Sequence, residues 1–139
     1  MSYLLDTCAL SEMVARKKNH SAFEAIKGLP REQLFLSVIV IGEIQSGIEQ
    51  MPECPRKDFL LTWLEKEILP GYDGRTFNID AEIARVWGGL NARLIQQGLK
   101  MQVKDSLIAA TAIVHGLTVV TRNQHDFVAS GVQILNPWE

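Results

Sequence analysis

Short runs of apolar residues alternate along the chain with longer segments in which apolar residues recur every three or four positions. The short runs, typical of β-strands, lie at residues 2–6, 34–38, 75–79, 118–121 and 132–135. Residues 2–6 and 118–121 are almost wholly apolar, as expected for strands that helices cover on both faces. The pattern predicts an α/β fold, a three-layer α/β/α sandwich around a short parallel sheet, without internal repeats.

The longer segments have the apolar spacing of helices, and most begin or end at recognisable capping or breaking residues. Ser37 and Asp80 are suitable N-caps, Pro55 suits a first helical turn, and Gly98 and Gly116 suit helix ends. Helices are expected from about Ala9 to Lys18, from Asn19 or Ser21 to Gly28, from Ser37 to Met51, from Pro55 to Pro70, from Asp80 to Gly98, and from near Asp105 to Gly116.

Length and composition indicate one folded domain. The chain has 139 residues, of which 47% are hydrophobic and 22% charged, enough for one buried core. No apolar run approaches the 18 or so residues of a membrane span, and Asp6 interrupts an N-terminal run that has no basic leader. We therefore expect a single domain over residues 1–139, located in the cytoplasm, with no membrane segment.

The charge balance and the cysteines narrow the function further. Fourteen basic residues against sixteen acidic ones give a formal charge of -2, so any contact with nucleic acid has to be local. Cys8 and Cys54 lie far apart without CxxC spacing. They are expected to be reduced thiols, and a zinc site is not expected.

Acidic and polar residues lie where ligands bind in open α/β sheets, beyond the carboxyl ends of the strands. Asp6 ends the first strand, and Glu43 lies in the first turns of the helix after the second. Asp105 opens the helix before residues 118–121, and Asn123 and Asp126 follow that strand. Each has an ordinary structural explanation, such as an N-cap for Asp105 or a surface ion pair for Glu43, but together they predict an acidic pocket.

Convergence of Asp6, Glu43 and Asp105 would need a counter-charge. Within about 5 Å, each like-charged pair costs on the order of 3 kcal/mol at an effective dielectric of 20. Glu43 lies in an apolar stretch, residues 39–44, so a positive group is expected to face it. Carboxylate oxygens suit magnesium or manganese (Mg²⁺ or Mn²⁺) better than zinc, which favours metal-assisted phosphoryl chemistry.

Other common chemistries lack their motifs. The chain has no GxxxxGK[ST] loop, no strand-linked GxGxxG and no GxSxG. A phosphatase with an aspartyl nucleophile would need an acid two residues after Asp6, where this chain has Cys8. The three histidines share no metal-binding spacing. His115 is expected to interact with a helix dipole, and His125 to face solvent.

Several segments carry a family resemblance across nearly the whole chain. They are YLLDT at 3–7, LSVIVIGEIQSGIE at 36–49, WLE at 63–65, the stretch from Asp80 through ARVWGGL, VKDSLIAATAIVHGLTVVTRNQHDF at 103–127, and the closing LNPW. In this order and spacing they resemble the PIN-domain ribonucleases, in particular the VapC and FitB-like toxins of type II toxin-antitoxin systems.

The resemblance implies a homodimeric, Mg²⁺- or Mn²⁺-dependent endoribonuclease that hydrolyses phosphodiester bonds of RNA, often structured RNA such as tRNA. It also implies inhibition by a small VapB-like antitoxin, encoded beside the toxin, in a higher-order complex. An arginine in the tail of such antitoxins often lies near the acidic pocket, where it would offset the same repulsion as the metal.

The resemblance also assigns roles to individual residues. Family metal ligands correspond to Asp6, Glu43 and Asp105. The fourth family position falls on Asn123, where relatives often have an acid, and Asp126 is the nearest alternative. Supporting residues that orient ligands or contact the RNA backbone correspond to Thr7, Thr121 and Arg122. Cys8 and Lys104 replace residue types that are more common in the family, and neither change removes a ligand.

Two other functions fit the same residues. One is a catalytically silent PIN-like interaction module that acts with a DNA-binding partner, and the intact acidic triad argues against it. The other is a structure-specific DNA nuclease, for which the chain lacks the insertions expected for threading DNA.

Overall fold

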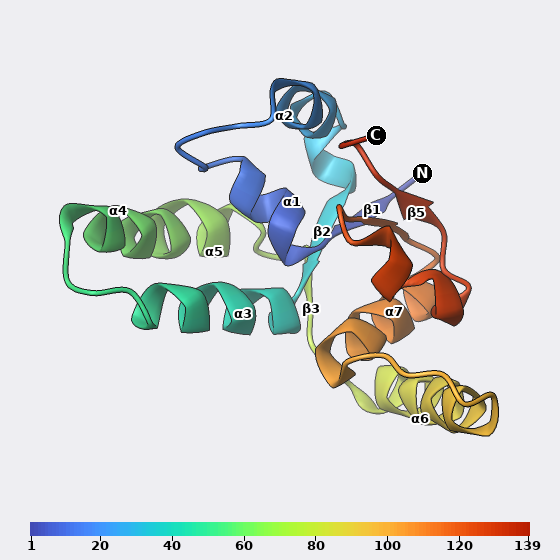
Figure 1. The fold of residues 1–139 in the computed structure, drawn as a ribbon. Helices are drawn as coiled ribbons and strands as arrows, with labels where there is room; N and C mark the ends of the chain where they lie inside the picture. Colours follow the sequence, from blue (N-terminus) through green and yellow to red (C-terminus); the bar gives the residue numbers. More distant parts are fainter.

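A computed structural model describes all 139 residues and has a five-stranded parallel sheet at its centre (Figure 1). All five predicted strands are confirmed, although none is longer than the four residues of β2. The strands are β1 (Tyr3–Leu5), β2 (Leu34–Ser37), β3 (Thr76–Phe77), β4 (Thr118–Val120) and β5 (Ile134–Leu135), in the spatial order β3-β2-β1-β4-β5.

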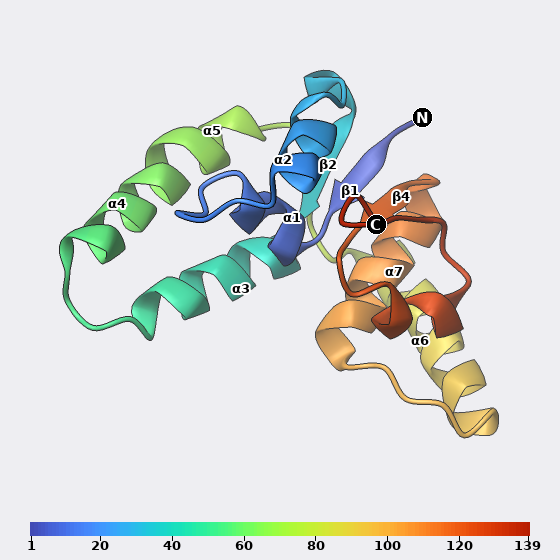
Figure 2. The ribbon, with the colours of Figure 1, turned by 45° about the horizontal axis from the view of Figure 1, so that its top comes forward.

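Helices cover both faces of this sheet, so the predicted three-layer α/β/α sandwich is confirmed. The connections from β1 to β2 and from β2 to β3 carry α1 to α5, and the connection from β3 to β4 carries α6 and α7. Because parallel crossovers are right-handed, reversing the direction along the sheet puts the two groups on opposite faces. Figures 1 and 2 show α3 to α5 on one side of the strands and α6 and α7 on the other.

The helices of the first face are α1 (Thr7–Glu12), α2 (His20–Lys27), α3 (Val38–Glu49), α4 (Pro55–Trp63) and α5 (Leu69–Gly71), and those of the second are α6 (Ala81–Gln96) and α7 (Val103–His115). Short 3-10 turns occupy Arg31–Gln33, Gln124–Asp126 and Val128–Ser130, and a π-helical turn occupies Leu64–Ile68.

The strand order reverses between β1 and β4, which lie side by side with Leu5 paired to Val120. From β1 the chain moves to β2 and β3 on one side, and from β4 it moves to β5 on the other. Ligand crevices of open α/β sheets form at such a reversal, beyond the carboxyl ends of the two strands. Asp6 directly follows β1 and Thr121 directly follows β4, so both lie at this point.

The two predicted N-caps, Ser37 and Asp80, form as expected, and of the two predicted starts of the second helix Asn19 is the cap. The Ser37 hydroxyl accepts a hydrogen bond from the Ile39 amide at 3.1 Å, and the Asn19 side chain accepts one from Ala22 at 3.0 Å. Asp80 caps α6 by accepting from the Ile83 amide at 2.9 Å. These side chains satisfy amide hydrogens that have no partner within the helix, and so they define where α2, α3 and α6 begin.

The first helix differs from the prediction of residues 9–18. It begins at Thr7, because the Asp6 carboxylate accepts from the Thr7 amide and caps the helix directly after β1. It ends at Glu12, whose carboxylate accepts from the Asn19 amide at 3.0 Å and so connects the end of α1 to the start of α2. The basic residues 16–18 therefore lie in the connection between these helices.

The helix that starts at Pro55 is predicted to break at Pro70 and Gly71, and the helical segment does end at Gly71. Before that point the chain passes through the π-helical turn of residues 64–68 and continues as α5. Proline lacks an amide hydrogen and fits in a first helical turn, where none is needed. The π turn changes the hydrogen-bond spacing just before that point, with the Leu69 amide donating to the Leu64 carbonyl, and Pro70 then lies in the first turn of α5.

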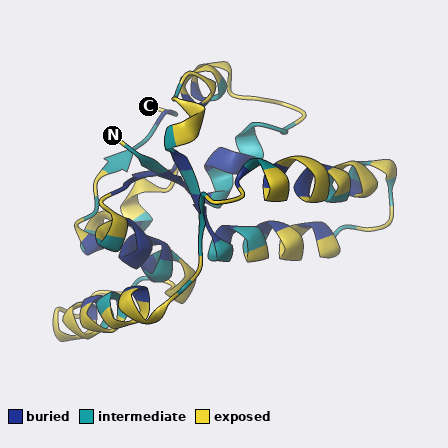
Figure 3. Cartoon of the chain, turned by 180° about the vertical axis from the view of Figure 1, so that it is seen from behind, coloured by how far each residue is buried: buried dark blue, intermediate teal, exposed yellow.

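The core consists of one continuous cluster of 23 buried hydrophobic residues between the sheet and its two helical layers. Leu4, Val119 and Phe127 are wholly buried, and the residues of β1, β2 and β4 are mostly buried, drawn dark blue in Figure 3. No helix is long and apolar enough to span a lipid bilayer. The rigid core fixes the carboxyl ends of β1, β2 and β4, from which the candidate site is built.

Candidate active site

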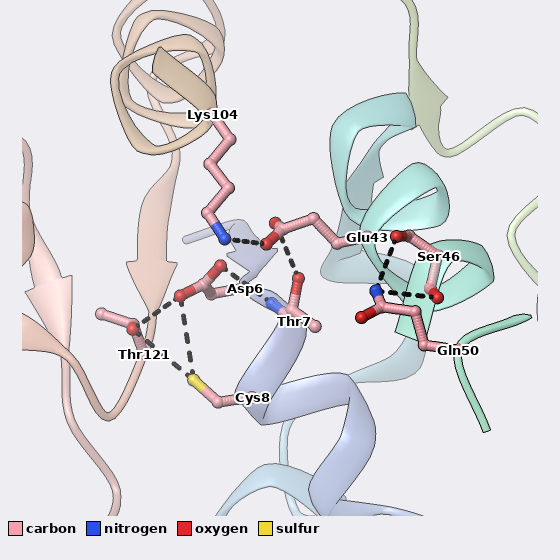
Figure 4. Close-up of polar contacts among 8 residues, drawn as sticks. All are labelled: Asp6, Thr7, Cys8, Glu43, Ser46, Gln50, Lys104 and Thr121. Atoms are coloured by element: carbon pink, nitrogen blue, oxygen red, sulfur yellow. Dashed lines mark hydrogen bonds and ion pairs between the residues drawn. The ribbon is translucent and has the colours of Figure 1, made fainter. Parts of the chain in front are cut away.

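Asp6 is the most buried acid of the site, with 6% of its surface exposed. Its Oδ1 accepts from the Thr7 amide at 2.8 Å, and its Oδ2 accepts from the Thr121 hydroxyl at 2.8 Å (Figure 4). The Cys8 thiol lies 3.8 Å from the same Oδ2. Donors from the ends of β1 and β4 therefore hold one carboxylate in a fixed orientation.

The environment of Asp6 disfavours its charge. Burial is the main cause, and it raises the pKa of the carboxyl above its ordinary value. The hydrogen bonds from Thr121 and Thr7 act in the opposite direction, and the negative charge of Glu43 raises the pKa further. The net direction is upward, so the protein environment favours the neutral carboxyl form of Asp6.

Glu43 lies in α3 and is bonded through both carboxylate oxygens. Oε1 accepts from the Thr7 hydroxyl at 2.9 Å, and Oε2 lies 2.9 Å from the ammonium of Lys104 (Figure 4). The prediction that a positive group faces Glu43 is confirmed, and that group is Lys104. Thr7 contacts both acids, with its amide on Asp6 and its hydroxyl on Glu43.

Asp105 lies in the first turn of α7, which begins at Val103 with Gln102 as its N-cap. The alternative role of Asp105 as an N-cap is therefore wrong. Its pKa is raised to about 6, first by burial and then by the negative charges of Asp6, Asp126 and Glu43, while Lys104 lowers it. All three other acids contribute to the raised pKa of this one carboxyl group, so Asp105 lies within electrostatic range of each of them.

Asn123 and Asp126, the candidates for the fourth position, differ in their surroundings. The Asn123 amide donates to the Thr121 hydroxyl at 3.0 Å, and its side chain is exposed. The Asp126 carboxylate contributes to the raised pKa of Asp105. It also lies 3.1 Å from Nε2 of His125, whose side chain faces solvent as predicted. The electrostatics therefore favour Asp126.

Arg122 and Cys8 lie next to each other at the end of β4, on the same side of the site as Thr121. The Arg122 amide donates to the Cys8 sulfur at 3.3 Å, and the Arg122 side chain is exposed. Cys8 lies 3.6 Å from the Thr121 hydroxyl, and burial raises the pKa of its thiol, so the neutral form is favoured. Both cysteines are free, as the sequence predicts.

Two contacts in the site were not predicted from the sequence. The sequence assigned Cys8 and Lys104 no contact in the site, whereas the structure places Cys8 beside Asp6 and Lys104 on Glu43. Their positions in the sequence, two residues after Asp6 and directly before Asp105, were the available signal. The sequence indicated that Glu43 needs a positive partner, but which residue supplies the charge depends on how α7 lies beside α3.

The donor set suits a hard divalent cation. Asp6, Glu43, Asp105 and Asp126 offer carboxylate oxygens, the ligand type that Mg²⁺ and Mn²⁺ prefer, and two of these groups have raised pKa values that a cation would relieve. No three acidic, histidine or cysteine side chains lie close enough to form a ready-made ligand cluster. The expected tight triad is therefore not preassembled, since Glu43 is bonded to Lys104 and Thr7 instead.

Comparison with known proteins agrees with this architecture. The PIN domain family model matches residues 3–129. The plasmid stability protein StbB of Pseudomonas syringae pv. tomato is 37% identical over 98% of both chains, and the VapC ribonuclease Y4jK of Sinorhizobium fredii is 35% identical over 98% of this chain and 97% of its own. The crystal structure of FitAcB from Neisseria gonorrhoeae aligns over 99% of both chains, with a TM-score of 0.93 and 32% identity. This chain belongs to the PIN-domain family.

Proposed function

We propose that this chain, as a single PIN domain over residues 1–139, is a divalent-metal-dependent endoribonuclease and the toxin of a type II toxin-antitoxin pair. The observation that carries the proposal is the linked pair of acids at the reversal point of the sheet, where Thr7 donates to both Asp6 and Glu43 and Lys104 of α7 pairs with Glu43. The names of two relatives, a VapC ribonuclease and the toxin FitB of Neisseria gonorrhoeae, support the same activity.

Asp6, Glu43 and Asp105 would hold the metal, with Asp126 or Asn123 at the fourth position. When bound, Mg²⁺ or Mn²⁺ would supply an activated water and neutralise charge on the phosphate. Thr121 and the Thr7 amide fix the Asp6 carboxylate, and the Thr7 hydroxyl fixes one oxygen of Glu43. Ligands held in this way lose little conformational freedom on binding, which favours a defined coordination geometry.

Asp105 makes metal binding depend on pH. With a pKa of about 6, its carboxyl group retains a fraction of its protons near neutral pH. A carboxyl group must be ionised to bind a cation, so Asp105 releases that proton when the site is loaded. Metal affinity is therefore expected to increase with pH across the range in which Asp105 titrates.

The RNA is expected to bind through local contacts, because the net charge of the chain is -2. The exposed side chain of Arg122 follows β4 at the edge of the acidic site, in the right place for a phosphate contact. A phosphate contact does not distinguish one base from another, so other surfaces of the protein have to select the RNA sequence that is cleaved.

The antitoxin is expected to bind the two grooves on the face of the sheet that α1 to α5 cover. One groove of about 790 Å³ is lined mostly by apolar residues, among them Leu10, Met13 and Trp63. A second, of about 350 Å³, extends to Thr7 and Glu43. Related solved structures are described as complexes of FitAB and VapBC with DNA. By analogy, we propose a homodimer that forms a higher-order complex with a VapB-like antitoxin in the cytoplasm.

The test is cleavage of RNA by the purified protein. Total RNA is incubated with the wild type or with Asp6→Asn, in Mn²⁺ or in EDTA, and the new RNA ends are sequenced. We expect defined ends only for the wild type in Mn²⁺. Addition of the small antitoxin encoded beside this chain should abolish that cleavage. Equal cleavage by both proteins, or cleavage in EDTA, would contradict the proposal. No cleavage with tight antitoxin binding would instead support a silent interaction module.

A further inference from the structure

Lys104 introduces a positive charge of the chain itself into the acidic site. Its ammonium lies 2.9 Å from Oε2 of Glu43, while Oε1 of the same carboxylate accepts from the Thr7 hydroxyl. Figure 4 shows the lysine extending from α7 to α3 above Asp6. Both oxygens of one proposed metal ligand are therefore already engaged, and one of them by a cation.

The position of Lys104 in its helix is unfavourable without these acids. It is the second residue of α7, at the end of the helix where the dipole repels positive charge. Three carboxylates offset this repulsion. The hydrogen bond and the charge of Glu43 raise the pKa of Lys104 most, and Asp105 and Asp6 raise it further. The ammonium thus lies in the field of the same acids that would bind the metal.

We propose that Lys104 is a tethered counter-ion that competes with the divalent cation for Oε2 of Glu43 and thereby lowers the affinity of the site for metal. This inference depends on the proposed function, since it concerns the same cation. An ammonium and a divalent cation repel each other at contact distance, so each weakens the binding of the other at the same carboxylate oxygen. Binding of the metal through Oε2 therefore displaces Lys104.

The structure allows this exchange at low cost. The Lys104 side chain is 50% exposed, whereas that of Glu43 is 20% exposed, so the lysine can rotate into water without moving the helix. The Thr7 hydroxyl keeps Glu43 oriented through the other oxygen while Oε2 becomes free. Lysine suits this role because its charge is compact and its stem flexible.

A metal titration of the RNA-free protein tests the inference. Lys104→Met removes the charge and keeps the length of the side chain. Lys100→Met is the matched control, because it removes the same charge from an exposed lysine in the segment before α7 that makes no ion pair with the site. Lys104→Arg keeps the charge. Mn²⁺ binding is measured by calorimetry, and the melting temperature is measured with and without Mn²⁺.

We expect Lys104→Met to lower the Kd for Mn²⁺ roughly five- to tenfold, while Lys100→Met stays within about twofold of the wild type. Lys104→Arg should bind no more tightly than the wild type. A fixed Mn²⁺ concentration should raise the melting temperature of Lys104→Met more than that of the wild type. Circular dichroism confirms folding, and Lys104→Gln replaces the methionine variant if that variant does not fold.

The outcomes separate this inference from the proposed function. If the wild type binds Mn²⁺ and Lys104→Met binds it equally or more weakly, the competition is refuted and the nuclease proposal stands. Weaker RNA binding by Lys104→Met with unchanged Mn²⁺ affinity would likewise refute competition and assign Lys104 to a phosphate contact. If neither protein binds Mn²⁺ at millimolar concentration, both the inference and the metal-dependent function are overturned. Asp6→Asn should abolish binding and so identifies the site being measured.

Discussion

Single residues of the site combine a structural and a chemical role. Asp6 caps α1 through the Thr7 amide and is also the most buried acid of the pocket. Thr7 begins the helix and joins Asp6 to Glu43 through its amide and hydroxyl. Substitutions at these positions therefore need readouts that separate folding from activity.

Asp6→Asn is the substitution that best makes this separation. Asparagine is as good an N-cap as aspartate, and it removes a buried charge that burial and Glu43 disfavour. We expect the metal-free free energy of unfolding to stay within about 1 kcal/mol of the wild type or to increase. RNA cleavage should fall by at least about a hundredfold, the typical effect of losing a charged group that acts in the transition state.

Urea unfolding in EDTA and a cleavage assay check these two expectations. Asp58→Asn is a suitable control, because it removes an exposed acid from the first turn of α4 and should leave cleavage unchanged. Strong destabilisation by Asp6→Asn would show that the carboxylate is required by the fold, and activity could then no longer identify it as a ligand.

Asp105 predicts how the stability of the metal-free protein depends on pH. Its pKa is about 6 when folded and near the ordinary value of 3.8 when unfolded, so the folded state binds its proton more tightly. The free energy of unfolding should therefore decrease as the pH rises between these two values, and level off above them. Because the group is partly exposed to solvent, we expect a total decrease of about 1 kcal/mol.

Urea titrations in EDTA between about pH 4 and 7.5 measure this slope, whose sign follows from proton linkage. Asp105→Asn should remove most of it. A smaller slope of the same sign should persist, since the pKa of Asp6 is also raised. A wild-type stability that is flat or increases over this range would contradict the arrangement of acids around Asp105.

Among the helices, the sequence predicts a boundary best where a single side chain determines it. Ser37 and Asp80 were identified as N-caps because their oxygens satisfy amides of the next turn, and α3 and α6 begin there. Asp6 was taken only as a strand end, and so the start of α1 was placed two residues too late. The helical segment between Pro55 and Gly71 contains a π turn, which apolar spacing does not indicate.

Two glycines test how helix ends and interiors differ. Gly116 caps α7 with a φ of 64°, a left-handed conformation that alanine adopts at a cost. Gly88 lies inside α6, where an added Cβ meets no atom within 4 Å. We expect Gly116→Ala to destabilise by about 1 kcal/mol and Gly88→Ala to stabilise by about 0.5–1 kcal/mol. Thermal or urea unfolding of both variants measures the difference, and equal signs would contradict it.

At the scale of the whole molecule, the class of the fold was predictable, but the geometry of the site was not. Alternating strands and helices imply a parallel sheet, and the rule for ligand crevices located Asp6 and Asp126 at one edge. The strand order arises from long-range packing, and apolar patterns carry no signal for it. The same holds for Lys104, because its contact with Glu43 requires α7 and α3, on opposite faces of the sheet, to meet at its edge.

The net charge of the chain determines how strongly its affinity for RNA should depend on salt concentration. A chain of charge -2 has no general attraction for phosphates, so binding rests on a few local cations. For single-stranded RNA, the logarithm of affinity falls with that of salt with a slope of about -0.7 per phosphate contact. Each phosphate contact made by the protein should therefore contribute about -0.7 to the measured slope.

Arg122→Gln, made in the inactive Asp105→Asn background, should reduce the steepness of this slope by about 0.7, the contribution of one phosphate contact. Lys27→Gln is the matched control, since that exposed lysine ends α2 just before the chain enters the amino end of β2, whereas Asp6 follows the carboxyl end of β1. Fluorescence anisotropy over a range of salt concentrations measures both. A lost phosphate contact must appear in the salt dependence of the variant that removes it. Equal slopes for Arg122→Gln and its parent would therefore place the RNA away from the end of β4. A less steep slope for Lys27→Gln would place the RNA on the side of α2.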